Sequence, residues 1–125
     1  HDINLQAEKA PIVILNFWAS WCKPCLEEFS SLTKLRKKYS KNQMKIIAIN
    51  TDVEKQSIEI KKVIKKYNLN FTIIPDKQGH IIRDFMIEAI PVSIIFNRGK
   101  VYQVSYGAKD FYSEEIIDNF DSLLK

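Results

Sequence analysis

Residues 21–25 read WCKPC and contain both cysteines of the chain, three positions apart. The residues before this stretch, 11–18, are nearly all apolar, which is typical of a strand buried on both faces. The residues after it carry an apolar side chain every three or four positions, which predicts an amphipathic helix over 23–39. The cysteines are therefore predicted to lie where a strand gives way to a helix.

This position has chemical consequences for Cys22. The unpaired backbone N–H groups and the macrodipole at a helix N-terminus favour an anion, so a thiolate on Cys22 is stabilised there. Lys23 adds a positive charge nearby. Pro24 suits the first helical turn, where its missing N–H costs nothing, and it stiffens the turn that holds the two sulfurs together.

Three other uses of the cysteine pair have to be weighed. A structural zinc site needs about four ligands, and the chain offers only His1 and His80 besides the cysteines. An inert disulfide stabilises most when it closes a long loop, and this one would enclose two residues. Two buried free thiols are the third alternative, although Lys23 and Pro24 are typical of an exposed turn. We favour a redox-active dithiol that needs no metal or other cofactor.

Composition and charge limit the remaining function classes. A chain of 125 residues with 46% hydrophobic and 27% charged residues is ordinary for a single soluble domain. The net charge of +4 comes from lysines scattered along the predicted helices, which is typical of a solvated surface. Aromatic residues and arginine are not interleaved with this charge, so nucleic-acid binding is not expected. Weak attraction to anionic lipid or acidic partners remains an alternative.

The first ten residues differ in composition from the rest of the chain. Residues 1–10 are polar and without apolar periodicity, so we expect a leader or the end of a linker there, followed by one domain over 11–125. No apolar run approaches the roughly 20 residues of a membrane span. The sequence starts at His1 and not at Met, which is compatible with a removed export signal or membrane anchor.

Periodicity and turn signals then predict the order of the elements. Strands are expected over 12–18, 44–50, 71–74, 92–96 and 101–106, and helices over 23–39, 60–67, 81–86 and 113–124. The first strand, helix and second strand form a βαβ unit, which favours parallel pairing. The short third helix is expected to pack onto the sheet through Ile81, Ile82, Phe85 and Met86.

This order, together with the sequence FWASWCKPC over 17–25, resembles the thioredoxin superfamily. Within it, the chain is most similar to the TlpA/ResA/CcmG group of thiol-disulfide oxidoreductases. That closer likeness rests on the sequence NFWASW at 16–21 before the first cysteine, the insert over 51–75, the PDKQG turn at 75–79 and the Ile-Pro pair at 90–91. It covers residues 11–124. The resemblance implies an α/β thioredoxin-like fold, a single domain with a central mixed sheet flanked by helices.

The chemistry expected of the dithiol is disulfide exchange with protein substrates. Cys22 attacks a substrate disulfide as a thiolate, and Cys25 resolves the mixed disulfide. Resemblance to the group implies an extracytoplasmic reductase of the bacterial periplasm or cell envelope. It would serve cytochrome c biogenesis or cell redox homeostasis, receive electrons from a membrane donor and act as a monomer. An oxidising or isomerising role stays open, because the sequence does not set the redox balance.

The resemblance also implies a role for Pro91. Proline at this place in the superfamily follows a cis peptide bond and faces the dithiol, where the residue before it offers its backbone to an extended substrate. We assign substrate binding to Trp21, Lys23, Pro24, Ile90 and Pro91. The alternative is an ordinary trans proline that begins a strand.

Asn16 is a departure from thioredoxin proper, which carries a buried aspartate six residues before its first cysteine. That acid helps to deprotonate the second thiol, and an asparagine cannot. The resemblance implies that a glutamate from the loop after the second strand replaces it. Glu54 is our candidate catalytic acid and Asp52 the reserve, with a solvated loop acid as the alternative for Glu54.

Two rival functions use the same fold. A thiol peroxidase would need a lone peroxidatic cysteine in a pocket of Pro, Thr and Arg, which residues 21–25 do not resemble. A non-catalytic binding domain would use the groove at Pro91 to hold a partner. Retention of both cysteines argues against the second rival, and an activity assay would separate it from an oxidoreductase.

Overall fold

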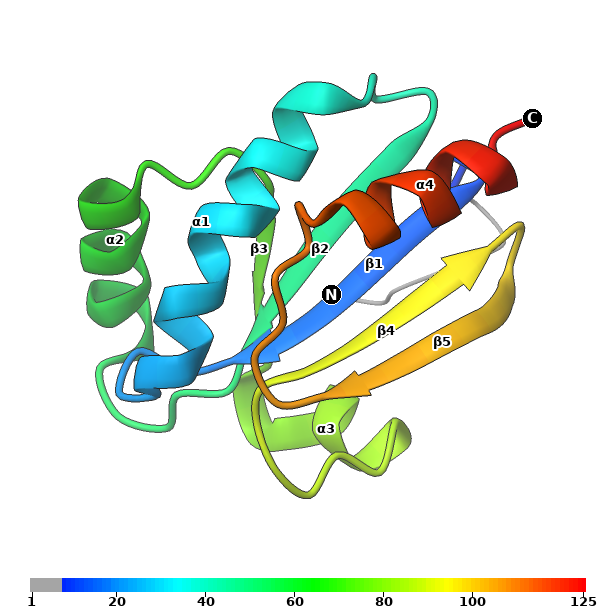
Figure 1. Ribbon diagram of the computed structural model, residues 1–125. Coiled ribbons are helices and arrows are strands. Elements are labelled where there is room, and N and C mark those ends of the chain that lie inside the picture. The colour runs from blue at the N-terminus through cyan, green and yellow to red at the C-terminus, as the bar shows by residue number, and fades with distance from the viewer. Residues whose placement is uncertain (1–7) are drawn as a thin grey trace.

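A five-stranded sheet forms the centre of the computed structural model, which describes residues 8–125 (Figure 1). The strands are β1 (Ile12–Trp18), β2 (Met44–Asn50), β3 (Thr72–Pro75), β4 (Val92–Asn97) and β5 (Lys100–Tyr106). The helices are α1 (Lys23–Lys38), α2 (Gln56–Tyr67), α3 (His80–Asp84) and α4 (Glu114–Leu123), with a 3₁₀ turn at Lys77–Gly79.

The strands lie in the order β3-β2-β1-β4-β5. β1, β2 and β3 are parallel, and β4 and β5 are each antiparallel to the strand before them in this order. The carboxyl ends of β1 and β2 therefore meet the amino end of β4 at one edge of the sheet. The turn over residues 19–22, which carries Cys22, follows β1 directly, so the topology places it at that edge.

Both faces of the sheet are covered, which explains the nearly continuous apolar sequence of β1. Ile12 and Ile14 face a core shared with α1, α2 and α4. Val13, Leu15 and Phe17 face a second core that α3 covers. In Figure 1, α1 and α4 cross the near face of the sheet, and α3 lies on the other side.

Aromatic packing fixes α1 on the sheet. Phe29 is fully buried, and its ring lies 5.0 Å from that of Trp18 and 5.7 Å from that of Phe71. Leu32 and Leu35 continue the same buried stripe. This contact holds the first turn of α1, and the cysteines with it, against the end of β1.

Most expected elements are present, with small shifts at their ends. β1 and β2 have the predicted bounds, while β3 runs one residue later and includes Pro75. The β4–β5 turn has positive φ at both Arg98 and Gly99, 51° and 84°, as a two-residue hairpin of the right twist requires. The predicted α/β fold with a central mixed sheet flanked by helices is confirmed.

Met86 was expected to pack onto the sheet, and this prediction is wrong. The side chain is 83% exposed. The helical periodicity on which the prediction rested stops early, because α3 ends at Asp84 and Met86 has a positive φ of 54°. Ile81, Ile82 and Phe85 do pack against the core beneath α3.

The segment before β1 is described from Glu8 onward, and residues 1–7 of the expected leader lie outside the described residues. Glu8 forms an ion pair with Lys45 on β2, with 3.1 Å between Oε1 and Nζ, and Ala10 is buried. Among the helices of residues 8–125, none is both long and apolar enough to cross a membrane.

Candidate active site

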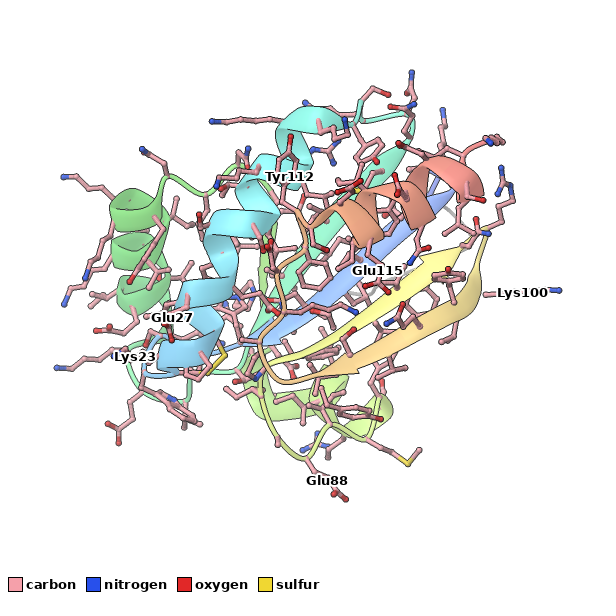
Figure 2. The ribbon with its side chains drawn as sticks, viewed as in Figure 1. Lys23, Glu27, Glu88, Lys100, Tyr112 and Glu115 are labelled. Carbon is pink, nitrogen blue, oxygen red and sulfur yellow. A yellow bond between two sulfur atoms is a disulfide. The ribbon has the colours of Figure 1, made fainter. Side chains whose placement is uncertain are left out.

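Cys22 and Cys25 form a disulfide at the start of α1, with their Cα atoms 5.3 Å apart. Figure 2 shows it as a yellow bond beside the first turn of α1, close to Lys23 and Glu27. The turn that leads from β1 into α1 and the spacing of the two cysteines thus bring the sulfurs into bonding reach, as expected from residues 21–25.

Cys22 occupies the N-cap position of α1. Its Sγ accepts a hydrogen bond from the backbone N–H of Cys25, with 3.3 Å between the heavy atoms. Cys22 retains 5% exposure, whereas Cys25 is fully buried. Lys23 and Pro24 are exposed beside them. Since an N-cap atom faces the positive end of the helix dipole, this geometry favours a thiolate on Cys22.

The loop after β2 supports the turn that carries the cysteines. Thr51 donates its backbone N–H to the carbonyl of Trp18 at 2.8 Å. The carboxylate of Asp52 accepts from the backbone N–H of Ser20 at 3.0 Å and from the Asn50 side chain at 3.1 Å. Asp52 is buried, and its carboxylate connects the turn at Ser20 to Asn50 at the end of β2.

The peptide bond between Ile90 and Pro91 is cis, as predicted. Pro91 is buried and Ile90 is half-buried. Ile90 packs against the apolar cluster that contains both cysteines. Trp21, in contrast, is 74% exposed beside the disulfide. Trp21 thus presents an apolar side chain to solvent next to Cys22 in the sequence, and the cis bond directly precedes β4.

The structure places Glu54, our candidate acid, at the surface. Its side chain is exposed, while Asp52, the reserve, is buried and engaged with the turn. A solvated carboxylate is poorly suited to take a proton from a buried thiol. This placement gives no support to a role for Glu54, while both oxygens of Asp52 already accept hydrogen bonds from Ser20 and Asn50.

A buried carboxylate beside Asn16 comes from α1 and not from a loop. Glu28 is 3% exposed. Its Oε1 accepts from Asn16 Nδ2 at 2.8 Å, and its Oε2 accepts from the backbone N–H of Lys109 at 2.9 Å. Asn16 Nδ2 also lies 2.9 Å from Ser93 Oγ. Because Glu28 follows Cys25 by three positions on one helix, the two side chains share a face.

Burial raises the pKa of Glu28 from 4.5 to about 7. The bonds from Lys109 N–H and from Asn16 and the positive charge of Lys109 act in the opposite direction, because they favour the carboxylate. A carboxyl group with this pKa is present in both protonation states near neutral pH, which suits proton transfer during thiol chemistry.

Sequence reasoning missed Glu28 because a glutamate in a charged helix ordinarily faces solvent. Two signals were available. Glu28 lies beside the buried stripe of Cys25 and Phe29, and Asn16 interrupts a strand of apolar residues. A buried amide needs a hydrogen-bond partner, and the cysteine-bearing helix packed on that strand was the place to look for one.

We expect the pKa of Glu28 to make folding stability depend on pH. Below pH 4.5 the group is protonated in both folded and unfolded chains, and between 4.5 and about 7 only the unfolded chain ionises. The free energy of unfolding should therefore fall as the pH rises through this window, by about 3 kcal/mol in total. Urea unfolding of the oxidised protein from pH 4 to 8 measures this.

Two variants isolate the contribution of Glu28 to the pH dependence of the free energy of unfolding. Glu28→Gln should lose this part of the pH dependence, while Glu27→Gln, which changes an exposed neighbour on α1, should keep it. Equal pH profiles for wild type and Glu28→Gln would show that Glu28 does not titrate in this range.

The described part of the chain, residues 8–125, has no group of three or more His, Cys, Asp or Glu side chains placed to hold a metal ion. The two sulfurs are bonded to each other.

A mixed sheet of this order, a disulfide at the start of its first long helix and a cis proline at the head of β4 define a thioredoxin-like protein. Residues 1–104 match the AhpC/TSA family, and the chain belongs to that family.

Relatives and solved structures agree with this assignment. The thiol-disulfide oxidoreductase ResA of Bacillus thuringiensis subsp. konkukian (strain 97-27) is 37% identical over 102 residues, which are 81% of this chain and 58% of ResA. The thioredoxin-like protein YneN of Bacillus subtilis (strain 168) is 37% identical over 101 residues, 80% of this chain and 58% of YneN. The chain thus spans about 58% of the length of these relatives.

Two crystal structures are similar over most of the chain. A protein described as thiol:disulfide interchange protein DsbE from Chlorobium tepidum superposes with a TM-score of 0.84 at 26% identity, covering 98% of this chain and 86% of the other. StoA from Bacillus subtilis superposes with a TM-score of 0.76 at 25% identity, and the match covers 92% of this chain and 85% of StoA. The resemblance to the thioredoxin superfamily and to the ResA and CcmG group is confirmed.

Proposed function

We propose that this protein is a thiol-disulfide oxidoreductase that acts on protein substrates. One observation carries the proposal: the Cys22–Cys25 disulfide caps α1, and a buried carboxyl group with a pKa of about 7 lies three positions beyond it. The arrangement combines a stabilised thiolate, a resolving thiol and a proton acceptor. The names of ResA and of the DsbE protein agree with it.

In the reducing direction, the Cys22 thiolate attacks one sulfur of a substrate disulfide. The substrate S–S bond breaks, a mixed disulfide forms, and the released substrate thiolate takes a proton from solvent. The Cys25 thiol then passes its proton to Glu28 and attacks Cys22. The second substrate thiolate leaves, so the substrate disulfide is reduced and the dithiol is oxidised. The oxidising direction is the reverse sequence.

The substrate-docking surface in this proposal consists of Trp21, Lys23, Pro24, Ile90 and Pro91. Trp21, Lys23 and Pro24 are exposed next to the disulfide. Pro91 lacks an N–H, which leaves room at the head of β4 for an extended peptide to approach. Exposed apolar area at Trp21 supports the same docking.

The physiological role we propose is that of an extracytoplasmic reductase in a bacterial periplasm or cell envelope. Cytochrome c biogenesis is the proposed process and a membrane protein the proposed electron donor, with the domain acting as a monomer. The likeness to ResA and to the DsbE protein supports this assignment. Separation of native cell fractions, with detection of this domain, would test the location.

Reduction of insulin in the presence of dithiothreitol tests the activity. We expect the wild-type protein to accelerate the precipitation of insulin chains severalfold over dithiothreitol alone, because its thiolate attacks disulfides faster. Cys22→Ser should return the rate to that of dithiothreitol. A wild-type rate equal to the blank would favour the non-catalytic binding domain instead.

A further inference from the structure

A groove of about 410 Å³ opens between α1 and the segment that follows β5, and Glu28 forms part of its lining. On its other side Glu28 is closed off by Asn16 and Ser93, which are both buried. Solvent in this groove therefore lies next to a carboxyl group that is otherwise enclosed by the core. The groove lies along α1, beyond the disulfide, and is separate from the proposed docking surface.

Lys109 lines the same groove and binds Glu28 through its backbone. Its backbone N–H donates to Glu28 Oε2 at 2.9 Å. The side chain of Lys109 reaches toward β5, where its Nζ lies 3.5 Å from Ser105 Oγ. The segment itself is tied to α1 through Ser31, whose Oγ accepts from the backbone N–H of Phe111 at 3.0 Å. The position of Lys109 relative to Glu28 is thus held by several bonds.

The charges around Glu28 come from α1 and from the segment after β5. Glu27 and Lys34 on α1 and Asp110 beside Lys109 also line the groove. The partners from β1 and β4, Asn16 and Ser93, are neutral. Among these groups Lys109 is the one whose positive charge lowers the pKa of Glu28, against the effect of burial. Lys34 is exposed, and solvent screens its charge.

We propose that Lys109 is a positioning residue for Glu28, whose backbone N–H fixes the carboxylate and whose ammonium group favours release of the Glu28 proton into the groove. The proposal rests on the function of Glu28 as the acceptor of the Cys25 proton. After that transfer, the O–H bond of Glu28 breaks, the proton goes to solvent water in the groove, and the carboxylate remains beside the positive charge. The site is then ready for the next cycle.

Titration of Glu28 in the oxidised protein tests this directly. Glutamate labelled with ¹³C at the side-chain carboxyl group reports each protonation state by NMR, and Glu28→Gln assigns the signal. Lys109→Met keeps the backbone N–H and a side chain of similar length but removes the charge. We expect it to move the Glu28 midpoint upward by roughly half a pH unit or more.

Matched variants distinguish a specific effect of Lys109 on the pKa of Glu28 from a general effect of the charge of the protein. Lys109→Arg should keep the wild-type midpoint, and Lys34→Met, which removes a charge at the same groove, should move it much less. A native-like circular dichroism spectrum confirms the fold of each variant. If Lys109→Met does not fold, Lys109→Gln is measured in the same way.

An unchanged Glu28 midpoint in folded Lys109→Met would overturn the proposal, and so would an equal shift in Lys34→Met. A second readout follows catalysis: the pH profile for resolution of the mixed disulfide should move upward with the Glu28 midpoint in Lys109→Met and stay in place in Lys109→Arg. The titration needs no substrate. A wild type inactive on insulin would refute the proposed function, while the Lys109-dependent shift would still be measured.

Discussion

Cys25→Ser is expected to stop turnover and to leave Cys22 bonded to its substrate. Cys22 caps α1 and is the more exposed of the two cysteines, so we expect it still to attack a substrate disulfide. The mixed disulfide then lacks its resolving thiol, which in the wild type is held on the same helical turn. Loss of this intramolecular step should slow resolution of the mixed disulfide on the order of 10³-fold, so the rate of insulin reduction should return to that of dithiothreitol alone. Mass spectrometry without reductant should find the covalent adduct.

Cys22→Ser is the matched control for this variant, because it makes a substitution of the same size on the other sulfur. It should be equally inactive and should form no adduct, since Cys25 is fully buried. An adduct on Cys25 in Cys22→Ser, with none in Cys25→Ser, would reverse the roles of nucleophile and resolving thiol.

Glu28→Gln is expected to slow resolution of the mixed disulfide by about 10²-fold at pH 7, because the group that accepts the Cys25 proton is gone. Removing a buried negative charge should also lower the pKa of the neighbouring thiol, since a carboxylate disfavours a thiolate. The first attack by Cys22 should change less than the resolution step. Stopped-flow mixing of the reduced protein with a disulfide peptide separates the two steps.

Two other glutamates provide the comparison. Glu27→Gln alters an exposed side chain on the same helical turn and should resolve at the wild-type rate. Glu54→Gln tests the acid that the sequence suggested, and the exposure of Glu54 leads us to expect no effect. A slow Glu54→Gln beside a normal Glu28→Gln would restore the loop acid and remove Glu28 from the mechanism.

The elements of the fold that could be predicted from the sequence are those whose conformation depends on residues close together in the chain. The bounds of β1 and β2 follow from runs of buried apolar side chains, and the turn at Arg98 and Gly99 follows from local backbone preferences. The cis bond before Pro91 is different, because only the resemblance to a family indicated it.

The acid in the site depends on contacts between distant segments. Glu28 is buried because Asn16, 12 positions away, and Lys109, 81 positions away, both donate to it. Helical periodicity places Glu28, and not the exposed Glu27, beside the buried stripe of Cys25 and Phe29, but it does not show which distant groups bind the carboxylate. Asn16 was recognised as a departure from thioredoxin, and the sequence suggested an acid from the loop after β2, whereas the carboxylate that Asn16 binds comes from α1.

The most direct test of the account is a single turnover followed by chemical quenching. Fully reduced wild-type protein is mixed with an equimolar amount of a protein that contains a disulfide, and samples are quenched with acid at successive times. The free thiols are then alkylated, and the mass of each species is measured by mass spectrometry. We predict a transient adduct at Cys22, followed by a Cys22–Cys25 disulfide that forms in step with the loss of the substrate disulfide. The contrary result is a protein that ends the reaction with both cysteines alkylated while the substrate disulfide stays intact. Under conditions where dithiothreitol reduces the same substrate, that result would contradict the proposed exchange reaction.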